Sequence, residues 1–263
     1  MAIKKLGTYR KLAATAPGQV SWTHGFWADK FRLDQDVIIP AIWEALQVPE
    51  NGAVFANLYV AAGLRTGRHL GTDWSDGDCY KWMEAVIWIY SITRDPAWDA
   101  WLDELIDVIA KTQDEDGYIN TQVQLTTVGR WSATIHHELY NMGHLMTAAC
   151  LHHQVTGKSQ FLDVAIRLGD YLDRVFSPRP PELAHFGWDP SNIMGLVDLY
   201  RETGGERYLA LADVFVTMRG SRPNPGGWAE VAATSDGTDQ NQDRVLLREE
   251  DDAVGHVVTA TYL

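Results

Sequence analysis

The sequence lacks the features that several protein classes require. It has only two cysteines, Cys79 and Cys150, in apolar helical contexts without CxxC spacing, which predicts reduced core thiols rather than a disulfide or metal pair. The GxSxG, P-loop and GxGxxG motifs are absent, so serine-hydrolase and nucleotide-binding functions have no support. No apolar run has the length of a signal peptide or a membrane span. We therefore expect a cytoplasmic protein without a membrane partner.

Basic residues are also scarce. Lysine and arginine total 22 against 35 acidic residues, which gives a net charge of -13. This charge repels a phosphate backbone and an anionic membrane surface, so we expect no nucleic-acid partner. Aromatic residues, in contrast, are abundant, with 11 tryptophans and 10 tyrosines. They suit a sugar-binding protein, because aromatic faces stack on the apolar faces of sugars, although core packing explains them equally well.

The length of 263 residues and the hydrophobic content of 46% predict one domain over 1–263 with a large core. Its organisation follows from a weak internal repeat, in which a helix ends at a threonine and an aromatic residue five positions later opens the next helix. The repeat occurs at residues 93–98, 156–161 and 203–208. Because each connector is short, the two helices that it joins form an antiparallel hairpin.

In each hairpin the first helix is apolar nearly all round and the second is amphipathic, which makes them inner and outer helices. Stacked hairpins of this kind form an open α-solenoid or a closed α/α toroid. Long polar loops before the inner helices, at 114–133 and 220–250, favour the toroid. We therefore predict an all-α toroid of the (α/α)6-barrel type, incomplete in this chain. Further helices are expected at 27–47 with a kink at Pro40, at 55–64, and from near Asp251.

The candidate site lies where the inner helices begin. The stretch His136–His144 is polar at its start and is followed by an apolar helical stripe, so His137 and Glu138 lie at the mouth of a central pocket. The spacing of His137 and His144, seven residues, is too long for one metal ion, and we expect no metal site here. His152, at the end of the same helix, is expected to be structural.

The other inner helices begin with carboxylates. Asp78 and Asp189 open two of them, and the run 249–252, which includes Glu250, opens another. Four such starts would direct their side chains into one pocket. Aspartate is also a good helix cap, so each of these residues, taken alone, fits a structural role as well as a functional one.

Five blocks in order carry a resemblance. They are Asp78–Ala85 (DCYKWMEA), Asp116–Thr121 (DGYINT), His137–His144 (HELYNMGH), Leu196–Arg201 (LVDLYR) and, last, Arg248-Glu249 with Ala253–His256. Together they resemble glycoside hydrolase family 127, the β-L-arabinofuranosidase-like family, from about residue 22 to 263. The resemblance implies an (α/α)6 barrel that hydrolyses terminal non-reducing β-L-arabinofuranosides with retention. It further implies a cysteine nucleophile held on zinc and a glutamate acid/base.

The resemblance also implies which roles this chain carries. The family's zinc ligands, nucleophile and acid/base correspond to segments downstream of Leu263, so no catalytic residue and no zinc ligand is assigned here. His137 and His256 match substrate-binding positions, and Asp189 replaces a family histidine, which changes a hydrogen-bond donor into an acceptor. The expected sugar-binding residues, including aromatic walls, are His137, Asp189, His256, Trp82, Tyr140 and Trp188.

Two alternatives remain open at this stage. One is an inverting glycosidase on the same toroid, for which Glu138 and Glu250 are the candidate pair of carboxylates. The other is a truncated, non-catalytic homologue that binds sugar or a partner protein. In either case an open barrel edge exposes apolar surface, so we expect a homo-oligomer as well as a glycoside or oligosaccharide ligand.

Overall fold

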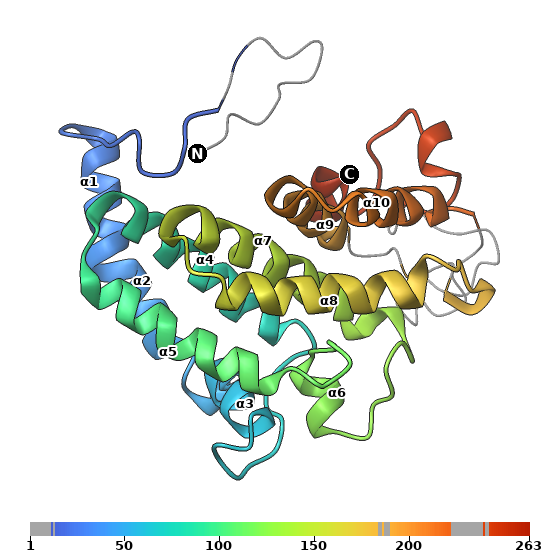
Figure 1. The fold of residues 1–263 in the computed structure, drawn as a ribbon, viewed down its shortest axis with the longest axis horizontal. Helices are drawn as coiled ribbons and strands as arrows, with labels where there is room; N and C mark the ends of the chain where they lie inside the picture. The colour runs from blue at the N-terminus through green and yellow to red at the C-terminus, as the bar shows by residue number, and fades with distance from the viewer. Residues whose placement is uncertain (1–11, 13, 184–185, 187–189, 222–238, 240–241) are drawn as a thin grey trace.

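The computed structural model describes residues 12, 14–183, 186, 190–221, 239 and 242–263 (Figure 1). Every regular element in these residues is helical, which confirms the predicted all-α class. None of the described helices combines the length and the apolar content that crossing a membrane requires.

The N-terminal helix is interrupted just before its proline. Helix α1 (Phe26–Leu33) continues through a π-helical turn (Asp34–Ile38) into α2 (Ile39–Ala45), so the helix predicted over 27–47 is present. Pro40 has no N–H, and its ring collides with the carbonyl four residues earlier in a regular α-helix. The wider π turn at this point accommodates that mismatch. Helix α3 (Val54–Ala61) follows, three residues shorter at its end than predicted.

The three predicted hairpins are confirmed. They consist of α4 (Ser75–Thr93) with α5 (Pro96–Thr112), α7 (Glu138–Thr156) with α8 (Gln160–Phe176), and α9 (Ser191–Thr203) with α10 (Glu206–Met218). Each connector begins with a residue in the left-handed backbone region, namely Arg94, Gly157 or Gly204.

The repeated threonine has a direct structural role. In the third hairpin the hydroxyl of Thr203 donates to the carbonyl of Leu199 at 2.7 Å and accepts from the N–H of Gly205 at 3.1 Å. Thr93 and Thr156 make the same two bonds in their hairpins. One side chain thus adds a second bond to a carbonyl in the last turn of one helix and satisfies an N–H of the connector.

The helices form two layers (Figure 1). In the inner layer α7 packs between α4 and α9, and in the outer layer α8 packs between α5 and α10. Helices α7 and α9 cross closely, since a Cβ on Gly143 would lie 2.3 Å from the backbone of Ser191 and a Cβ on Gly195 would lie 2.5 Å from the carbonyl oxygen of Gly143. Two glycines therefore allow the inner helices to meet at this crossing.

The C-terminal helix begins later than expected. The sequence predicts an inner helix from near Asp251, but α11 spans Val257–Tyr262 and is capped by His256. A 3-10 turn at Leu247–Glu249 precedes it. Gly255 has a φ of 75°, which a right-handed helix excludes, so residues 251–255 cannot extend α11 toward its N-terminus. Helix α11 packs on α9.

Candidate functional site

Aromatic and histidine side chains gather at the N-terminal ends of α4 and α7. The ring of Trp74, which precedes α4, meets the ring of His137 edge-on at 5.2 Å between centroids. His137 in turn lies 5.8 Å from Tyr140, and Tyr140 lies 4.7 Å from His144. We call Trp74, Lys81, His137, Tyr140 and His144 the rim cluster. The cluster joins two inner helices at their starts, where the sequence places the mouth of the site.

Backbone geometry fixes the position of His137. Its φ of 50° and ψ of 24° lie in the left-handed region, which residues other than glycine seldom adopt. This conformation turns the chain from a short 3-10 segment (Thr134–His136) directly into α7. The imidazole thereby projects beside the first turn of the helix, next to Trp74 and Tyr140.

Lys81 brings a positive charge to the rim cluster. Its ammonium donates to the hydroxyl of Tyr140 at 2.7 Å and pairs with Asp78 at 2.8 Å. Burial lowers the pKa of Lys81, but the hydrogen bonds and charges of Asp78 and Tyr140 outweigh it and leave the pKa raised. Lys81 therefore stays charged at neutral pH and orients the Tyr140 hydroxyl.

His144 lies one turn deeper than Tyr140 and is buried. Burial, and secondarily the charge of Lys81, lowers its pKa to about 4, so the ring is neutral at pH 7. Neither ring nitrogen has a hydrogen-bond partner among the described residues. The ring of Tyr262 on α11 lies 6.0 Å away, so the C-terminal helix closes over this part of the rim cluster.

Glu138 points away from the rim cluster. Its carboxylate accepts a short hydrogen bond from the Tyr118 hydroxyl and another, at 2.7 Å, from the N–H of Trp131. Burial raises the pKa of Glu138 to about 7, against the opposing effects of Tyr118, Trp131 and Arg130. The carboxylate thus ties the long loop before α7 to the helix, and its geometry lends no support to a two-carboxylate mechanism.

Two buried polar residues anchor the helix starts, and sequence reasoning missed both. The Asp76 carboxylate accepts from the N–H of Thr121 at 2.7 Å and from its hydroxyl at 2.6 Å. The Asn141 side chain accepts from the N–H of Gly77 and donates to the carbonyl of Asp73, both at 2.8 Å. The available signal was the placement of Asn141 in an otherwise apolar helix, because a buried amide requires partners.

The remaining predicted residues lie elsewhere or outside the described residues. Trp82 is buried among Trp43, Phe55 and Trp101, and its indole N–H donates to the carbonyl of Ile39, so its position lends no support to a role as a pocket wall. His256 caps α11 by accepting from the N–H of Thr259. Glu250 lies 3.7 Å from Arg244, and one of its carboxylate oxygens is buried without a hydrogen-bond partner among the described residues. Trp188 and Asp189 fall outside the described residues.

The two thiols do not fit the zinc-held cysteine that the resemblance implies. Cys79 on α4 and Cys150 on α7 are buried in the core, with exposures of 0% and 1%. Burial raises the pKa of the Cys79 thiol well above its ordinary value, with smaller contributions from Asp76 and Asp78. Because the core encloses both thiols, neither is placed to act as an accessible nucleophile.

An arc of helical hairpins with a histidine and aromatic cluster at the starts of its inner helices defines an α/α-barrel protein of the glycoside hydrolase type. The chain belongs to the family described as the β-L-arabinofuranosidase GH127 catalytic domain, whose model matches residues 19–263.

Known proteins show how much of that family the chain represents. It is 35% identical over 229 residues to the non-reducing end β-L-arabinofuranosidase of Bifidobacterium longum subsp. longum, which covers 78% of this chain and 34% of that protein. A GH127 β-L-arabinofuranosidase structure from Geobacillus stearothermophilus T6 matches with a TM-score of 0.80 and 32% identity, covering 90% of this chain and 40% of that one. A second structure, of a GH127 β-arabinofuranosidase, matches with a TM-score of 0.76 and 28% identity, covering 94% of this chain and 38% of that one. The chain thus spans less than half the length of these relatives.

Proposed function

We propose that this chain provides the sugar-binding face of a glycoside hydrolase that acts on terminal β-L-arabinofuranosides. The rim cluster is the observation that carries the proposal. It combines a tryptophan face, imidazoles and a lysine-oriented phenol, and these groups suit a small sugar that offers an apolar face and several hydroxyls. Membership of the GH127 family and the β-L-arabinofuranosidase names of two relatives support this substrate class.

Within this proposal the residues have distinct roles. His137 and Tyr140 hydrogen-bond sugar hydroxyls, and Trp74 supplies the stacking face. His256 and Asp189 contribute further hydrogen bonds, and Trp188 a second wall, as the family resemblance implies. The strained backbone of His137 favours a functional role, because such conformations persist where the surroundings fix them and cluster at ligand sites. Hydrolysis itself is not assigned to residues of this chain, since neither thiol fits the zinc-bound nucleophile.

The test is binding of methyl β-L-arabinofuranoside, followed by calorimetry or saturation-transfer NMR. His137→Ala and Tyr140→Phe should each weaken binding by about three- to tenfold, the loss expected for one hydrogen bond. His153→Ala is the control, because His153 lies near the opposite end of α7, where it contacts Glu202 at 2.6 Å. Equal effects of the His137 and His153 substitutions would remove the rim cluster from the proposed site.

We also propose that the chain associates with itself through the apolar edges of its helical arc. Phe26, Trp27 and Val37 at one edge and Val257 and Val258 at the other are largely exposed. Large exposed apolar patches mark interaction surfaces in soluble proteins. The elements that carry them, α1 with the π-helical turn that follows it and α11, lie at opposite ends of the arc of inner helices (Figure 1).

A further inference from the structure

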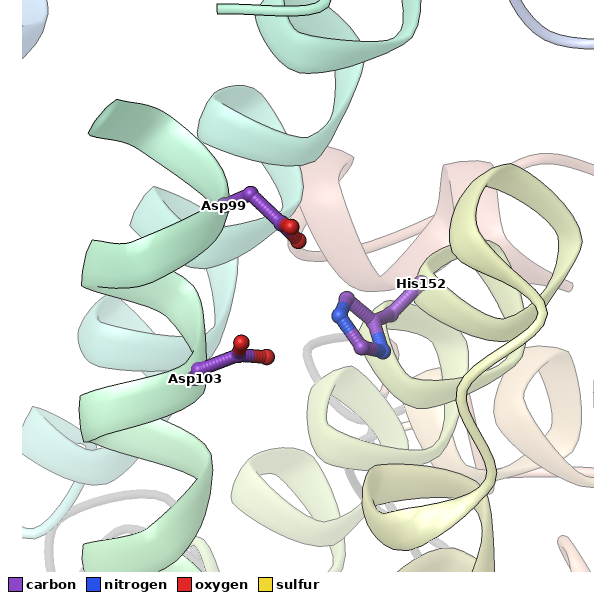
Figure 2. A group of neighbouring side chains, drawn as sticks. All are labelled: Asp99, Asp103 and His152. Atoms are coloured by element: carbon purple, nitrogen blue, oxygen red, sulfur yellow. The ribbon is translucent and has the colours of Figure 1, made fainter. Parts of the chain in front are cut away.

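Three potential metal ligands converge near the other rim of the arc, where the helices of each hairpin connect. Asp99 and Asp103 lie one turn apart on α5, and His152 lies near the end of α7. One ligand atom from each residue lies within 4.8 Å of the others. Figure 2 shows both carboxylates and the imidazole directed toward the same space between the two helices.

His152 is the observation that points to a ligand. Its side chain is 1% exposed, and neither ring nitrogen has a hydrogen-bond partner among the described residues. A buried polar group without a partner costs about 1–3 kcal/mol, so its presence calls for an explanation. Burial, and next the charge of Lys158, lowers the pKa of His152 to about 4. An unpaired ring nitrogen can supply the lone pair that a metal ligand needs.

Lys158 presently supplies the positive charge. Its ammonium lies 2.7 Å from Asp99 and 2.7 and 2.8 Å from the two oxygens of Asp103. One ammonium neutralises only one of the two carboxylates and leaves the imidazole nitrogens unpaired. The Lys158 side chain is 39% exposed, so it can turn into solvent when a stronger cation arrives.

We propose that Asp99, Asp103 and His152 bind one divalent transition-metal cation, of which zinc is the first to test, in place of the Lys158 ammonium. Two carboxylate oxygens and one imidazole nitrogen suit zinc and its neighbours, whereas calcium and magnesium prefer oxygen alone. Bond lengths of about 2.0–2.2 Å bring such ligands to about 3.5 Å from one another, which small side-chain rotations from the observed spacing achieve.

This site is separate from the rim cluster. Fifteen residues along α7 separate His137 from His152, which at 1.5 Å per residue is about 22 Å. The cation would join α5 of the first hairpin to α7 of the second and thus stabilise their packing. The inference therefore does not depend on the sugar-binding proposal.

Titration of the metal-free 263-residue chain with zinc, followed by calorimetry, tests the proposal. A parallel titration with cobalt reports the ligand set through the absorption spectrum of the bound ion. The wild type should bind one zinc ion per chain. Lys158→Met should bind about fivefold more tightly, since about 1 kcal/mol of ion pairing no longer competes. Asp103→Asn should bind at least about fivefold more weakly, and His152→Asn should weaken binding at least as much. Lys111→Met is the control, because it makes the same change at an exposed position of α5. Its zinc affinity should equal that of the wild type.

The Lys158 side chain is partly exposed, so Lys158→Met is expected to fold. This variant therefore tests the proposal even if His152→Asn does not fold. Absence of saturable zinc binding by both the wild type and Lys158→Met would overturn the proposal. So would an affinity that Lys158→Met and Asp103→Asn leave unchanged, because zinc would then bind elsewhere.

Discussion

Glu138 is a buried carboxylate held by two donors, the Tyr118 hydroxyl and the Trp131 N–H. Its raised pKa means that the folded chain binds a proton more tightly than the unfolded chain does. The contribution of this group to stability is therefore fully present below its ordinary pKa of 4.5 and is lost as the pH rises through about 7.

Glu138→Gln should remove this pH dependence. Between pH 4.5 and 8 the wild type should lose about 3 kcal/mol of unfolding free energy through Glu138, because a rise of its pKa from 4.5 to about 7 corresponds to that amount. Glutamine carries no charge and can still accept from Trp131 while Tyr118 turns to accept from its amide. Urea unfolding at pH 5 and pH 8 measures the difference, with the exposed Glu115→Gln as control. Parallel pH profiles for the wild type and Glu138→Gln would contradict the assignment.

At the scale of elements, the hairpin connectors depend on single threonines. Thr203→Val removes a bond to the Leu199 carbonyl and a bond from the Gly205 N–H. The loss in unfolding free energy should be about 1 kcal/mol, because the Gly205 N–H loses its partner while the Leu199 carbonyl keeps the backbone bond from Thr203 within α9. Thr217→Val is the matched control, since that hydroxyl donates only to carbonyls within its own helix, and it should cost less. Thermal or urea unfolding measures the loss of stability in both variants. Equal losses would contradict the role assigned to Thr203.

The crossing of α7 and α9 is the second feature at this scale. Gly143→Ala places a Cβ 2.3 Å from the backbone of Ser191, so the two inner helices must separate. We expect a loss of about 3 kcal/mol or more, as for other overpacked cores. Gly129→Ala is the control, because the nearest atom to its added Cβ is 3.9 Å away. Chemical unfolding gives the comparison, and similar stability of the two variants would show that the crossing tolerates separation.

The hairpins were predictable because their signal is local. A threonine that bonds both to its own helix and to the connector recurs at the same position of each hairpin, and an aromatic residue opens each outer helix. Gly255 shows where local signals compete, since one left-handed residue overrides the acidic start predicted for the last helix. Helix α4 shows a case in which the local pattern does not reveal which side of a helix faces the core. It is apolar nearly all round, so the pattern did not reveal that Trp82 faces the core.

The candidate site was predictable in part for the same reason. His137 and Tyr140 share one helix start, which a single segment specifies. Their partners Trp74 and Lys81 come from a segment some sixty residues earlier, and only the packing of α4 on α7 brings them together. The convergence of Asp99 with His152 depends in the same way on long-range packing, which residue spacing does not encode.

At the scale of the whole molecule, the described helices form an arc with two exposed apolar ends. Burial of such surface contributes about 25 cal/mol per Å², so the exposed apolar side chains at the two ends favour association where they meet a complementary patch. Trp27 is 65% exposed, and Val257 is 71% exposed. The net charge of -13 opposes association. Association should therefore become stronger as salt screens the repulsion between chains.

Light scattering coupled to size exclusion should therefore report a multiple of 29.5 kDa that increases with protein concentration and with salt. Trp27→Ser together with Val257→Ser should shift the chain toward the monomer, because both edges lose apolar area. Leu64→Ser removes an apolar side chain that is 49% exposed in the loop after α3, away from both edges, and should leave the mass unchanged. A monomer at all concentrations and salt levels would mean that the edges are too small or too far apart to pair. A mass that falls equally in the edge and loop variants would place the contact on another surface.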